Sequence, residues 1–454
     1  MTEPPDTSAD LAQLPPYEHV DFQALADNDE EFNKVWKKCA GHLDFQDPDC
    51  VRALTKAGLK VDFGLDIDLP ADRLCPPVPN RFNYVAWIQK LLDCTSADYS
   101  DEYDPSRKVV GLDIGTGASA IYTLLCLKPR PNWTMCATDV DKKSFDCATR
   151  NLAINNMLPR TRILRTMETN SLIPLKALAV DKLDFTICNP PFFADEQDMR
   201  SSLKGEGKSW SPNSVCTGAE VEMVCEGGDV GFVTRIVNES LELREKVTWY
   251  SSMLGKLSSV KAIVHLLKKH DINNWAVGSI DVGGATKRWT VAWSFGDYRP
   301  KHSIARIELI ANEYLPFPTG YEIPLGADHT PVAARKTIDN QLSALDLHWT
   351  WNAETSTGIG IAAQNVWKRA YRREFERRKK DAATAEHKAK SPDDDDDDAM
   401  QIASPEPPAS VALAFRIHVY GTTKGSVAID WLRGTDQVLW ESFCGMIHRS
   451  FRKG

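Results

Sequence analysis

Short apolar runs alternate with amphipathic segments in the middle of the chain. The apolar runs have the length of buried strands and span residues 108–115, 133–141 and 182–189. Segments 118–128 and 144–156, which lie between them, carry apolar residues at helical spacing. Apolar strands that are separated by helices form parallel βαβ units with both faces of the sheet covered. The pattern therefore predicts a doubly wound α/β domain over residues 80–300.

The pattern changes after residue 300. Segment 303–312 alternates like a strand, and segments 330–345 and 365–380 have helical spacing. Beyond residue 410, two alternating segments precede a helical one. A piece as short as 411–454 cannot bury a sufficient core alone. We therefore expect it to complete a smaller α+β domain with residues 301–380.

Two acidic segments separate these regions. Residues 381–410 include six consecutive aspartates and few apolar side chains, which predicts a disordered acidic linker. Residues 1–30 are similarly acidic and are expected to form a disordered tail, followed by a capping, RNA-binding extension over 31–79. Residues 1–31 carry a charge of −9 and residues 381–410 a charge of −7, so the rest of the chain carries +7 although the whole chain carries −9. A basic body keeps nucleic acid open as a partner.

Other sequence features concern location and redox state. The first residues lack the basic and apolar parts of a signal peptide, and no stretch approaches the ~20 apolar residues of a membrane span. The eleven cysteines lie in apolar contexts, without CxxC pairs or histidine spacing suited to zinc. We expect a nuclear or cytoplasmic protein with reduced cysteines, no membrane association and no metal.

Candidate ligand-binding residues follow the first two predicted strands. The turn LDIGTGASA contains Asp113, Gly115 and Gly117, and its glycines allow a tight turn and close approach of a ligand to the backbone. This turn recurs in many nucleoside-binding sheets and lacks the third glycine of the dinucleotide fingerprint. Asp139 lies 24 residues after Gly115 and is placed to accept hydrogen bonds from ribose hydroxyls. Its alternative role, capping the next helix, could be filled by Asp141.

The third predicted strand ends in ICNPPFFAD. Asn189, Pro190 and Pro191 form a stiff turn, and Phe192 and Phe193 follow where a loop normally carries polar residues. An aromatic pair packed on the core would explain the phenylalanines alone. The carboxyl ends of parallel strands meet at one edge, so three such ends together predict a ligand site there.

The order of these motifs resembles class I S-adenosylmethionine-dependent methyltransferases, whose NPPF motif marks methylation of an exocyclic or amide nitrogen. The resemblance implies that the Asn189 side-chain oxygen and the Pro190 carbonyl accept the two N–H bonds of an adenine amine. These bonds aim the nitrogen lone pair, and Phe192 stacks on a flipped base. The cofactor supplies an activated methyl group, so no dedicated base and no metal are required.

A narrower resemblance covers residues from about 30 to 300. The chain looks like the methyltransferase-like family that modifies an adenine of U6 small nuclear RNA, which is related to bacterial enzymes acting on 23S ribosomal RNA. The segments that carry this resemblance are PPVPNRFNYVAWI, GLDIGTGASAIY, CNPPFFA, TGAEVEMVCEGGDVGFVTRIVNESLEL, WYSSMLGK and RWTVAWSF. It implies a Rossmann-like seven-stranded sheet and an RNA adenine N(6)-methyltransferase. Such an enzyme supports pre-mRNA splicing, and we expect it to be a monomer acting on structured RNA with a flipped adenine.

The resemblance also assigns roles to individual residues. Arg81 holds the cofactor's carboxylate and Asp139 its ribose. The turn from Asp113, with Gly115, Thr116, Gly117 and Ser119, lines the methionine end. Asn189, Pro190, Pro191 and Phe192 form the catalytic adenine site, and Asn189 also contacts the cofactor, leaving S-adenosylhomocysteine as product.

Two positions depart from the family. Gln46 stands where the animal relatives have a lysine in the RNA groove, and loop 165–172 lacks the lysine that they carry there. RNA affinity and any gating by this loop are therefore expected to differ.

Basic residues elsewhere are candidates for RNA contact. Loop 195–218 follows the catalytic turn and carries Arg200, Lys204 and Lys208, and Arg288 is a further candidate. Residues 367–380 combine arginines and lysines with an aromatic stripe. Three interpretations of that segment stay open: a solvated helix packed by its aromatics, an RNA clamp, or a nuclear import signal.

Three other functions stay open on the sequence. They are methylation of ribosomal RNA, methylation of a protein glutamine through a related NPPY motif, and RNA binding by a scaffold without catalysis. The intact segment Asn189 to Phe192 argues against the last, because a pure binder does not need it.

Overall fold

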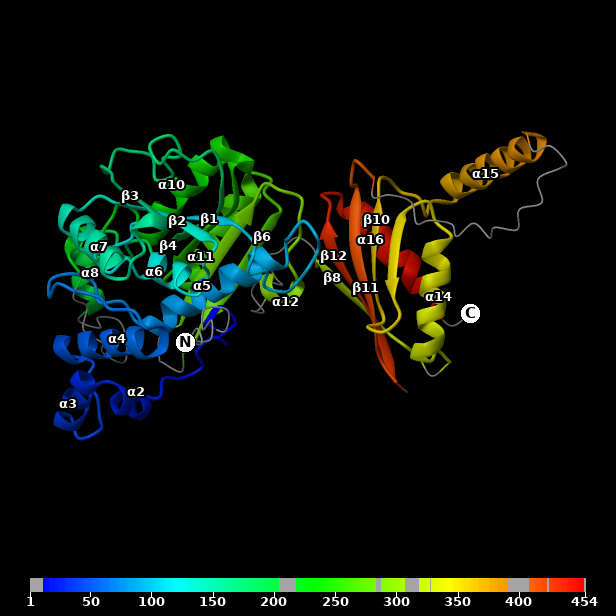
Figure 1. Cartoon of the computed structure of the whole chain (residues 1–454). Coiled ribbons are helices and arrows are strands. Elements are labelled where there is room, and N and C mark those ends of the chain that lie inside the picture. Colours follow the sequence, from blue (N-terminus) through cyan, green and yellow to red (C-terminus); the bar gives the residue numbers. More distant parts are fainter. Residues whose placement is uncertain are drawn as a thin grey trace, which may run out of the picture. The chain divides into compact units, whose positions relative to one another are not determined.

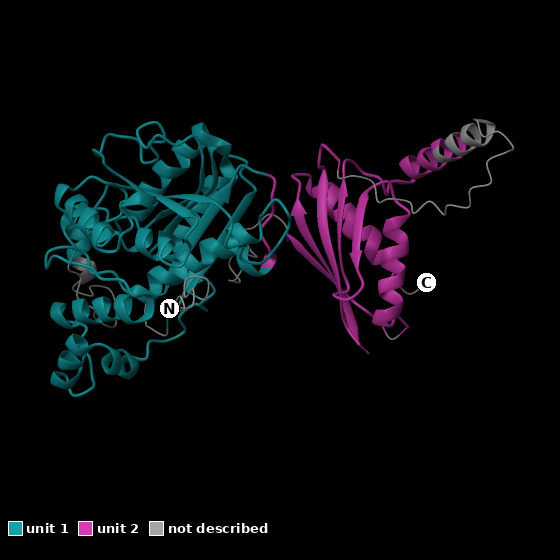
Figure 2. Ribbon diagram, viewed as in Figure 1, with its two compact units in different colours: residues 1–296, 303–315 teal, residues 297–302, 316–454 magenta. Residues whose placement is uncertain are grey.

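The computed structural model describes residues 11–203, 218–282, 287–306, 318–326, 328–389, 408–422 and 424–452 (Figure 1). The chain divides into two compact units (Figure 2). Unit 1 comprises residues 1–296 and 303–315, and unit 2 comprises residues 297–302 and 316–454.

A seven-stranded sheet forms the centre of unit 1, with strand order β3-β2-β1-β4-β5-β7-β6. Strand β7 runs antiparallel to both of its neighbours, and the other pairs are parallel. This arrangement confirms the predicted Rossmann-like, doubly wound sheet. The strands are β1 (Val109–Ile114), β2 (Trp133–Asp139), β3 (Thr161–Arg165), β4 (Leu183–Cys188), β5 (Val247–Leu254), β6 (Asn274–Ile280) and β7 (Arg288–Ser294).

Helices cover both faces of this sheet (Figure 1). One face packs against α5 (Val78–Asp93), α6 (Ile121–Leu127) and α7 (Lys142–Ile154), and the other against α10 (Gly228–Leu243) and α11 (Leu257–Lys269). The connections contain α8 (Glu196–Leu203), α9 (Glu220–Met223), α12 (His302–Ala305) and the 3-10 turns η1 (Leu158–Arg160) and η2 (Arg244–Lys246). Both apolar layers are buried, so the carboxyl ends of β1, β2 and β4 are held at one edge.

The N-terminal segment is ordered from residue 11, which corrects the predicted tail. Helices α2 (Phe22–Asn28), α3 (Glu30–Lys38) and α4 (Pro48–Phe63) share a small core that includes Leu25 and Phe32. Two of the acidic residues in this segment have a structural role, because Asp21 caps α2 and Asp29 caps α3. Residues 1–10 of the predicted tail lie outside the described residues.

The segment that precedes these helices, residues 12–17, forms a strap that is hydrogen-bonded to α5. The Gln89 side chain donates to the carbonyl of Ala12 at 3.1 Å. The Asn83 amide exchanges two hydrogen bonds with the backbone of Tyr17, at 2.7 and 2.8 Å. The strap therefore packs along the helix that also carries Arg81.

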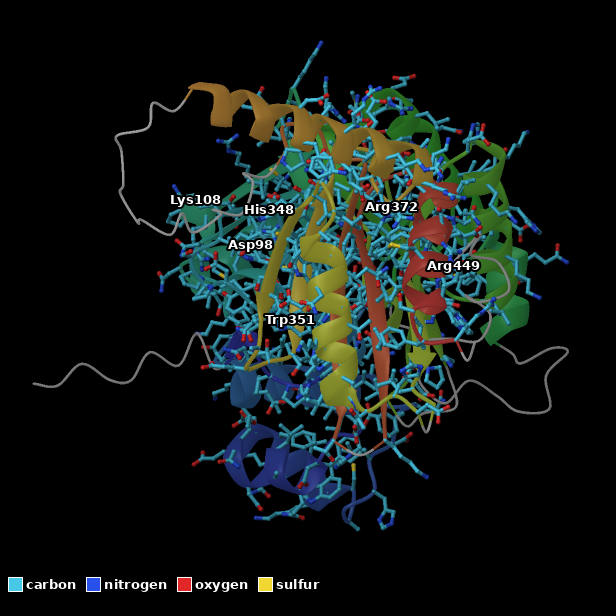
Figure 3. The ribbon with its side chains drawn as sticks, turned by 90° about the vertical axis from the view of Figure 1, so that its right-hand side faces the viewer. Asp98, Lys108, His348, Trp351, Arg372 and Arg449 are labelled. Carbon is cyan, nitrogen blue, oxygen red and sulfur yellow. The ribbon has the colours of Figure 1, made fainter. Side chains whose placement is uncertain are left out.

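A five-stranded antiparallel sheet forms the centre of unit 2, in the order β8-β12-β11-β10-β9. Figure 3 shows α14 and α16 across one of its faces, where they enclose the core of the unit. Strands β11 and β12, which follow residue 410, lie in the middle of the sheet. The elements are β8 (Gly320–Pro324), α14 (Pro331–Ser343), β9 (His348–Asn352), β10 (Thr357–Ala362), α15 (Arg369–Ala389), β11 (Leu413–Gly421), β12 (Gly425–Arg433) and α16 (Gln437–Arg449).

Two expectations for the C-terminal region are wrong in detail. Residues 302–305 form the short helix α12 rather than the start of a strand, and residues 307–312 lie outside the described residues. Helix α15 continues to Ala389, so the first nine residues of the predicted linker are helical. Residues 390–407 of the linker lie outside the described ranges.

Two general properties can be stated for the described part of the chain. Its cysteines are free thiols. None of its helices combines the length and the hydrophobicity needed to cross a lipid bilayer.

We predict that Phe443→Ala destabilises unit 2 by about 3–5 kcal/mol, because a buried aromatic side chain is replaced by a cavity. The Phe443 ring is fully buried, with its centroid 3.9 Å from that of Phe415. Urea unfolding of the full chain measures the loss. The control Val438→Ala removes a side chain that is 75% exposed and should change stability by less than about 0.5 kcal/mol. Equal stability of the two variants would contradict the packing role.

Candidate active site

The turn after β1 forms a backbone cradle. Gly115 and Gly117 have φ values of +69° and +64°, which glycine adopts without strain. Below the turn, Asp113 is fully buried and its Oδ2 accepts hydrogen bonds from the hydroxyls of Thr116 at 2.7 Å and Thr123 at 3.0 Å. Burial raises the pKa of Asp113 to about 6. The carboxyl group thus holds the shape of the turn from beneath.

Asp139 ends β2 and is bonded to the neighbouring turns. Its Oδ2 accepts from the amide of Gly117 at 2.8 Å, and its Oδ1 accepts from the amide of Asp141 at 2.9 Å. Asp141, in turn, caps α7 by accepting from the amide of Ser144. The helix cap is therefore supplied by Asp141, as the sequence allowed, and Asp139 lies at the ligand edge. Burial raises the pKa of Asp139 above its ordinary value.

Asn189 ends β4 and is held by a buried cation. The Arg81 guanidinium, which is 6% exposed, donates through Nη1 to Asn189 Oδ1 at 2.7 Å and to the Tyr122 hydroxyl at 2.9 Å. The same nitrogen lies 3.3 Å from Met253 Sδ. Arg81 therefore orients the amide predicted to be catalytic, a contact that the sequence did not indicate.

The Phe192 ring lies between Gly255 and Arg288. A Cβ placed on Gly255 would lie 3.0 Å from Phe192 Cδ1, and the Arg288 guanidinium carbon lies 5.4 Å from the ring centroid. Burial lowers the pKa of Arg288. The glycine at position 255 leaves the room that the aromatic ring needs, and Arg288 supplies a cation beside it.

Phe193 has a backbone role. Its amide donates to the carbonyl of Met223 at 3.0 Å, and its carbonyl accepts from the amide of Cys225 at 3.0 Å. These bonds dock residues 218–226 beside the NPPF turn. This backbone pairing explains part of the conformation of the chain after the NPPF turn.

Loop 166–173 follows β3 and is fastened to α10. Glu239 accepts from the Ser171 hydroxyl at 2.7 Å and from the amides of Leu172 and Ile173 at 2.8 and 3.0 Å. The Arg235 guanidinium donates to the carbonyl of Glu168 at 3.1 Å. This loop is thus held by one carboxylate and one guanidinium of the same helix.

These segments enclose a cavity of about 930 Å³. The predicted residues that line it are Arg81, Gly115, Thr116, Gly117, Ser119, Asp139, Asn189 and Pro191. Of the other predicted site residues, Asp113 supports the turn from below, and Pro190 and Phe192 continue the NPPF turn without lining the cavity. Residues 166–172, which belong to the loop singled out in the sequence, supply a further wall, and so do residues 219–222 and 224–226, which sequence reasoning missed.

The expected RNA contacts are only partly described. Arg200 is exposed on α8 and forms an ion pair with Glu196 at 2.6 Å. Lys204 and Lys208 lie outside the described residues. Gln46 is exposed in the turn before α4. Of the predicted basic residues that the structure describes, Arg288 is the one placed beside the NPPF turn.

The missed residues Glu222, Arg235 and Glu239 share one property. Each of them bonds to at least one backbone group that lies 66 to 148 positions away in the sequence. No local sequence motif indicates such long-range pairs. The three residues nevertheless lie within the segment from Thr217 to Leu243, which is part of the family resemblance.

The comparisons with known proteins agree over unit 1. A family model described as RNA methyltransferase matches residues 16–297. The U6 small nuclear RNA (adenine-(43)-N(6))-methyltransferase of Schizosaccharomyces pombe is 39% identical over 266 residues, which cover 59% of this chain and 66% of that protein. The RNA N(6)-adenosine-methyltransferase METTL16 of Gallus gallus is 38% identical over 61% of this chain and 49% of its own length. The matches thus cover between about half and two thirds of these relatives.

Solved structures give the same result. The catalytic domain of human METTL16 in complex with a MAT2A 3′UTR hairpin has 35% identity and a TM-score of 0.54, covering 61% of this chain and 91% of that one. The N-terminal domain of human METTL16 in complex with SAH has 34% identity and a TM-score of 0.50, covering 61% and 95%.

We predict that Glu239→Ala frees loop 166–173. The amides of Leu172 and Ile173 lose a charged acceptor, so their hydrogen exchange should accelerate about 10- to 100-fold, as expected for a bond worth about 1.5–3 kcal/mol. The amide of Thr166, which donates to the carbonyl of Asp139 at 2.8 Å, should keep its rate and serves as an internal control. Unchanged exchange at Leu172 and Ile173 would show that Glu239 does not hold the loop.

Proposed function

The chain belongs to the RNA methyltransferase family whose model matches residues 16–297, and from this membership we propose that it methylates N6 of an adenosine in U6 small nuclear RNA. The methyl donor is S-adenosylmethionine, and the activity supports pre-mRNA splicing. The observation that carries the proposal is the placement of Asn189. This residue lines the same cavity as the Gly115–Gly117 turn and Asp139, so an amide that can accept from an amine and a nucleoside-type site share one space.

The residues present fit S-adenosylmethionine. A Cβ on Gly115 would meet nothing within 4 Å, so there is open space above the turn for a ligand to approach the backbone. Asp139 retains lone pairs for ribose hydroxyls, and Ser119 and Arg81 offer donors at the methionine end. When bound, the cofactor supplies a methyl group on a sulfonium, an electrophile that needs no covalent help from the protein.

The chemical task of the protein is to orient the amine. An adenine amine is a poor nucleophile because its lone pair is delocalised into the ring. Asn189 Oδ1 and the Pro190 carbonyl can each accept one of its N–H bonds, which favours a more tetrahedral nitrogen. Arg81 occupies one lone pair of Asn189 Oδ1 and leaves another for the substrate, while it fixes the orientation of the amide.

The adenine must leave its helix to reach this cradle. Enzymes that act on a base extrude it into a pocket and stack it on aromatic or apolar side chains. Phe192 supplies the ring, and Arg288 beside it supplies a charge for the neighbouring phosphate. The relatives named above, which act on U6 RNA or bind an RNA hairpin, support RNA as the substrate.

Unit 2 is proposed to strengthen RNA binding through α15. Trp367 and Tyr371 fasten the start of this helix to the rest of the unit, through hydrogen bonds to Ser442 and Asp346. The exposed side of the helix carries Arg369, Arg372, Arg373 and Arg377 (Figure 3 labels Arg372). An arginine-rich exposed helix with a fastened aromatic side is suited to phosphate contacts.

The decisive experiment incubates the full chain with methyl-labelled S-adenosylmethionine and total RNA, followed by mapping of the labelled nucleotide. We expect label at N6 of one adenosine of U6 RNA. Label in ribosomal RNA, or in protein glutamine when a protein extract is added, would replace U6 as the substrate. Absence of label from every RNA and protein would favour the scaffold function.

The variant Asn189→Ala should reduce methyl transfer by at least about 100-fold, because one of two amine acceptors is lost. RNA affinity, measured by fluorescence anisotropy with a U6 transcript, should change less than about three-fold. Wild-type turnover in this variant would remove Asn189 from the mechanism.

We predict that changing Arg372, Arg373 and Arg377 to glutamate weakens U6 binding by the full chain at least about ten-fold and lowers its salt dependence by about one unit of slope per lost phosphate contact. Lys268→Glu with Lys269→Glu on α11 is the charge control and should change affinity little. Unchanged affinity with loss of nuclear accumulation would identify α15 as an import signal. Unchanged affinity and unchanged location would leave it as a solvated helix.

A further inference from the structure

Glu222 is a half-buried carboxylate in the cavity wall with no assigned role. It lies on α9, in the segment that the backbone of Phe193 docks beside the NPPF turn. Burial raises the pKa of its carboxyl group. Burying a carboxylate costs free energy unless hydrogen-bond donors satisfy its oxygens.

One oxygen of Glu222 has its donors within the chain. Oε2 accepts from the amide of Leu74 at 2.9 Å and from the amide of Ala219 at 2.9 Å. Leu74 belongs to the segment before α5, and Ala219 precedes α9. The two bonds fix the position of the carboxylate and join two segments that are far apart in the sequence.

The other oxygen faces the predicted cofactor turn. The position of a Cβ on Gly117 would have Glu222 Oε1 as its nearest neighbour, at 3.9 Å. Gly117 is also the residue whose amide donates to Asp139 Oδ2. Oε1 and the Asp139 carboxylate therefore approach the same short stretch of backbone, and both residues line the cavity.

The nearby cation, Arg73, forms hydrogen bonds with other side chains. The charge of Arg73 favours the ionised form of Glu222, but the Arg73 guanidinium donates to Asp141 at 2.8 Å, to Ser144 at 3.2 Å and to Asp72 at 3.0 Å. Within the described residues, the hydrogen bonds of Glu222 go to Oε2. Oε1 is thus a fixed, ionisable acceptor that a ligand in the cavity can use.

Two carboxylates suit the cis-diol of a ribose better than one carboxylate does. It presents two O–H donors on adjacent carbons. Each oxygen of Asp139 already accepts one backbone amide, which reduces what Asp139 alone can offer to both hydroxyls. A second carboxylate beside Gly117 lets each hydroxyl have an ionised acceptor, and such bonds are about twice as strong as neutral ones.

We propose that Glu222 Oε1 is a second carboxylate ligand of the cofactor ribose, which it shares with Asp139. This inference rests on the proposed use of S-adenosylmethionine. Because the same carboxylate holds Leu74 and Ala219, ribose recognition depends on the docking of residues 218–226 against the N-terminal segment.

The test measures binding, not turnover. Isothermal titration calorimetry is performed on the full chain with S-adenosylhomocysteine, its 3′-deoxyribose analogue, its 2′-deoxyribose analogue and an analogue lacking the methionine amino group. Glu222→Gln is nearly isosteric, because its amide oxygen can still accept from Leu74 and Ala219 while its NH₂ group faces the cavity. The charge control is Glu242→Gln, an exposed carboxylate on α10.

The wild-type chain should bind S-adenosylhomocysteine at least about ten-fold more tightly than Glu222→Gln does, and Glu242→Gln should match the wild type. Loss of one ribose hydroxyl should weaken wild-type binding about ten-fold and Glu222→Gln binding by no more than about two-fold, because the contact is already gone. Loss of the amino group should weaken both proteins equally.

Three results would overturn the inference. Equal hydroxyl effects in both proteins would make Glu222 a clamp for Leu74 and Ala219 alone. Coupling to the amino group rather than to a hydroxyl would make it a ligand of the methionine end. Absence of S-adenosylhomocysteine binding by the wild-type chain would remove the proposed cofactor itself, which separates failure of the proposed function from failure of this step.

A second variant covers the case in which Glu222→Gln lowers the melting temperature. Glu222→Asp keeps the charge but draws the carboxylate back by about one carbon–carbon bond, roughly 1.5 Å. It should show the same reduced hydroxyl effect. A full wild-type hydroxyl effect in a folded Glu222→Asp protein would again reduce Glu222 to a structural role.

Discussion

The buried guanidinium of Arg81 is the contact on which the rest of the site depends. A charge that is 6% exposed is costly unless hydrogen bonds compensate it. Here the compensation comes from Asn189 and Tyr122, on separate elements, so helix α5, helix α6 and the end of β4 are fixed by one side chain. Asn189 is consequently oriented before any ligand arrives. In the proposed reaction, an acceptor that is already aligned needs no reorganisation when the amine enters, which is the form of electrostatic help that a poor nucleophile requires.

Carboxylates fix the loops around that contact. A loop at a strand end has backbone amides that no ladder satisfies, and each needs a partner when it is buried. Asp139 accepts hydrogen bonds from the amides of Gly117 and Asp141. Glu239 accepts from the loop after β3. Glu222 accepts from the amides of Leu74 and Ala219. Two of these acids, Asp139 and Glu222, also line the cavity. The side chains that fix these two loops therefore also place acidic groups in the cavity wall.

The sequence predicted the strand ends because parallel strands place their carboxyl ends together, whatever the details of packing. Asp113, Gly115, Asp139 and Asn189 follow from that rule. Glu222 and Glu239 do not, because the backbone amides of Leu74, Leu172 and Ile173 that they bind are distant in the sequence and leave no periodic signal. The strand expected from residue 303 fails for a related reason, since alternation over a few residues fits a short helical turn as well as a strand. The acidic N-terminal segment differs from the expected tail because aspartates that cap helices give a segment the same acidic composition as a disordered tail.

In unit 2, the sequence of one strand can be understood only together with the sequences of the strands beside it. Strand β10 reads TGIGIA, which is a poor strand by composition because glycine has no side chain to pack. A Cβ on Gly360 would lie 2.1 Å from Phe415 Cζ, and one on Gly358 would lie 2.2 Å from Trp349 Cη2. The glycines therefore make room for aromatic rings of the adjacent strands, one of which follows the acidic linker. Because the cost of closing a loop grows slowly with its length, a long linker can separate β10 from β11 at little expense in stability. Strands β11 and β12, which lie inside the sheet, are the last strands in the sequence. The aromatic core of this unit therefore forms only when the segments before and after the linker are both present.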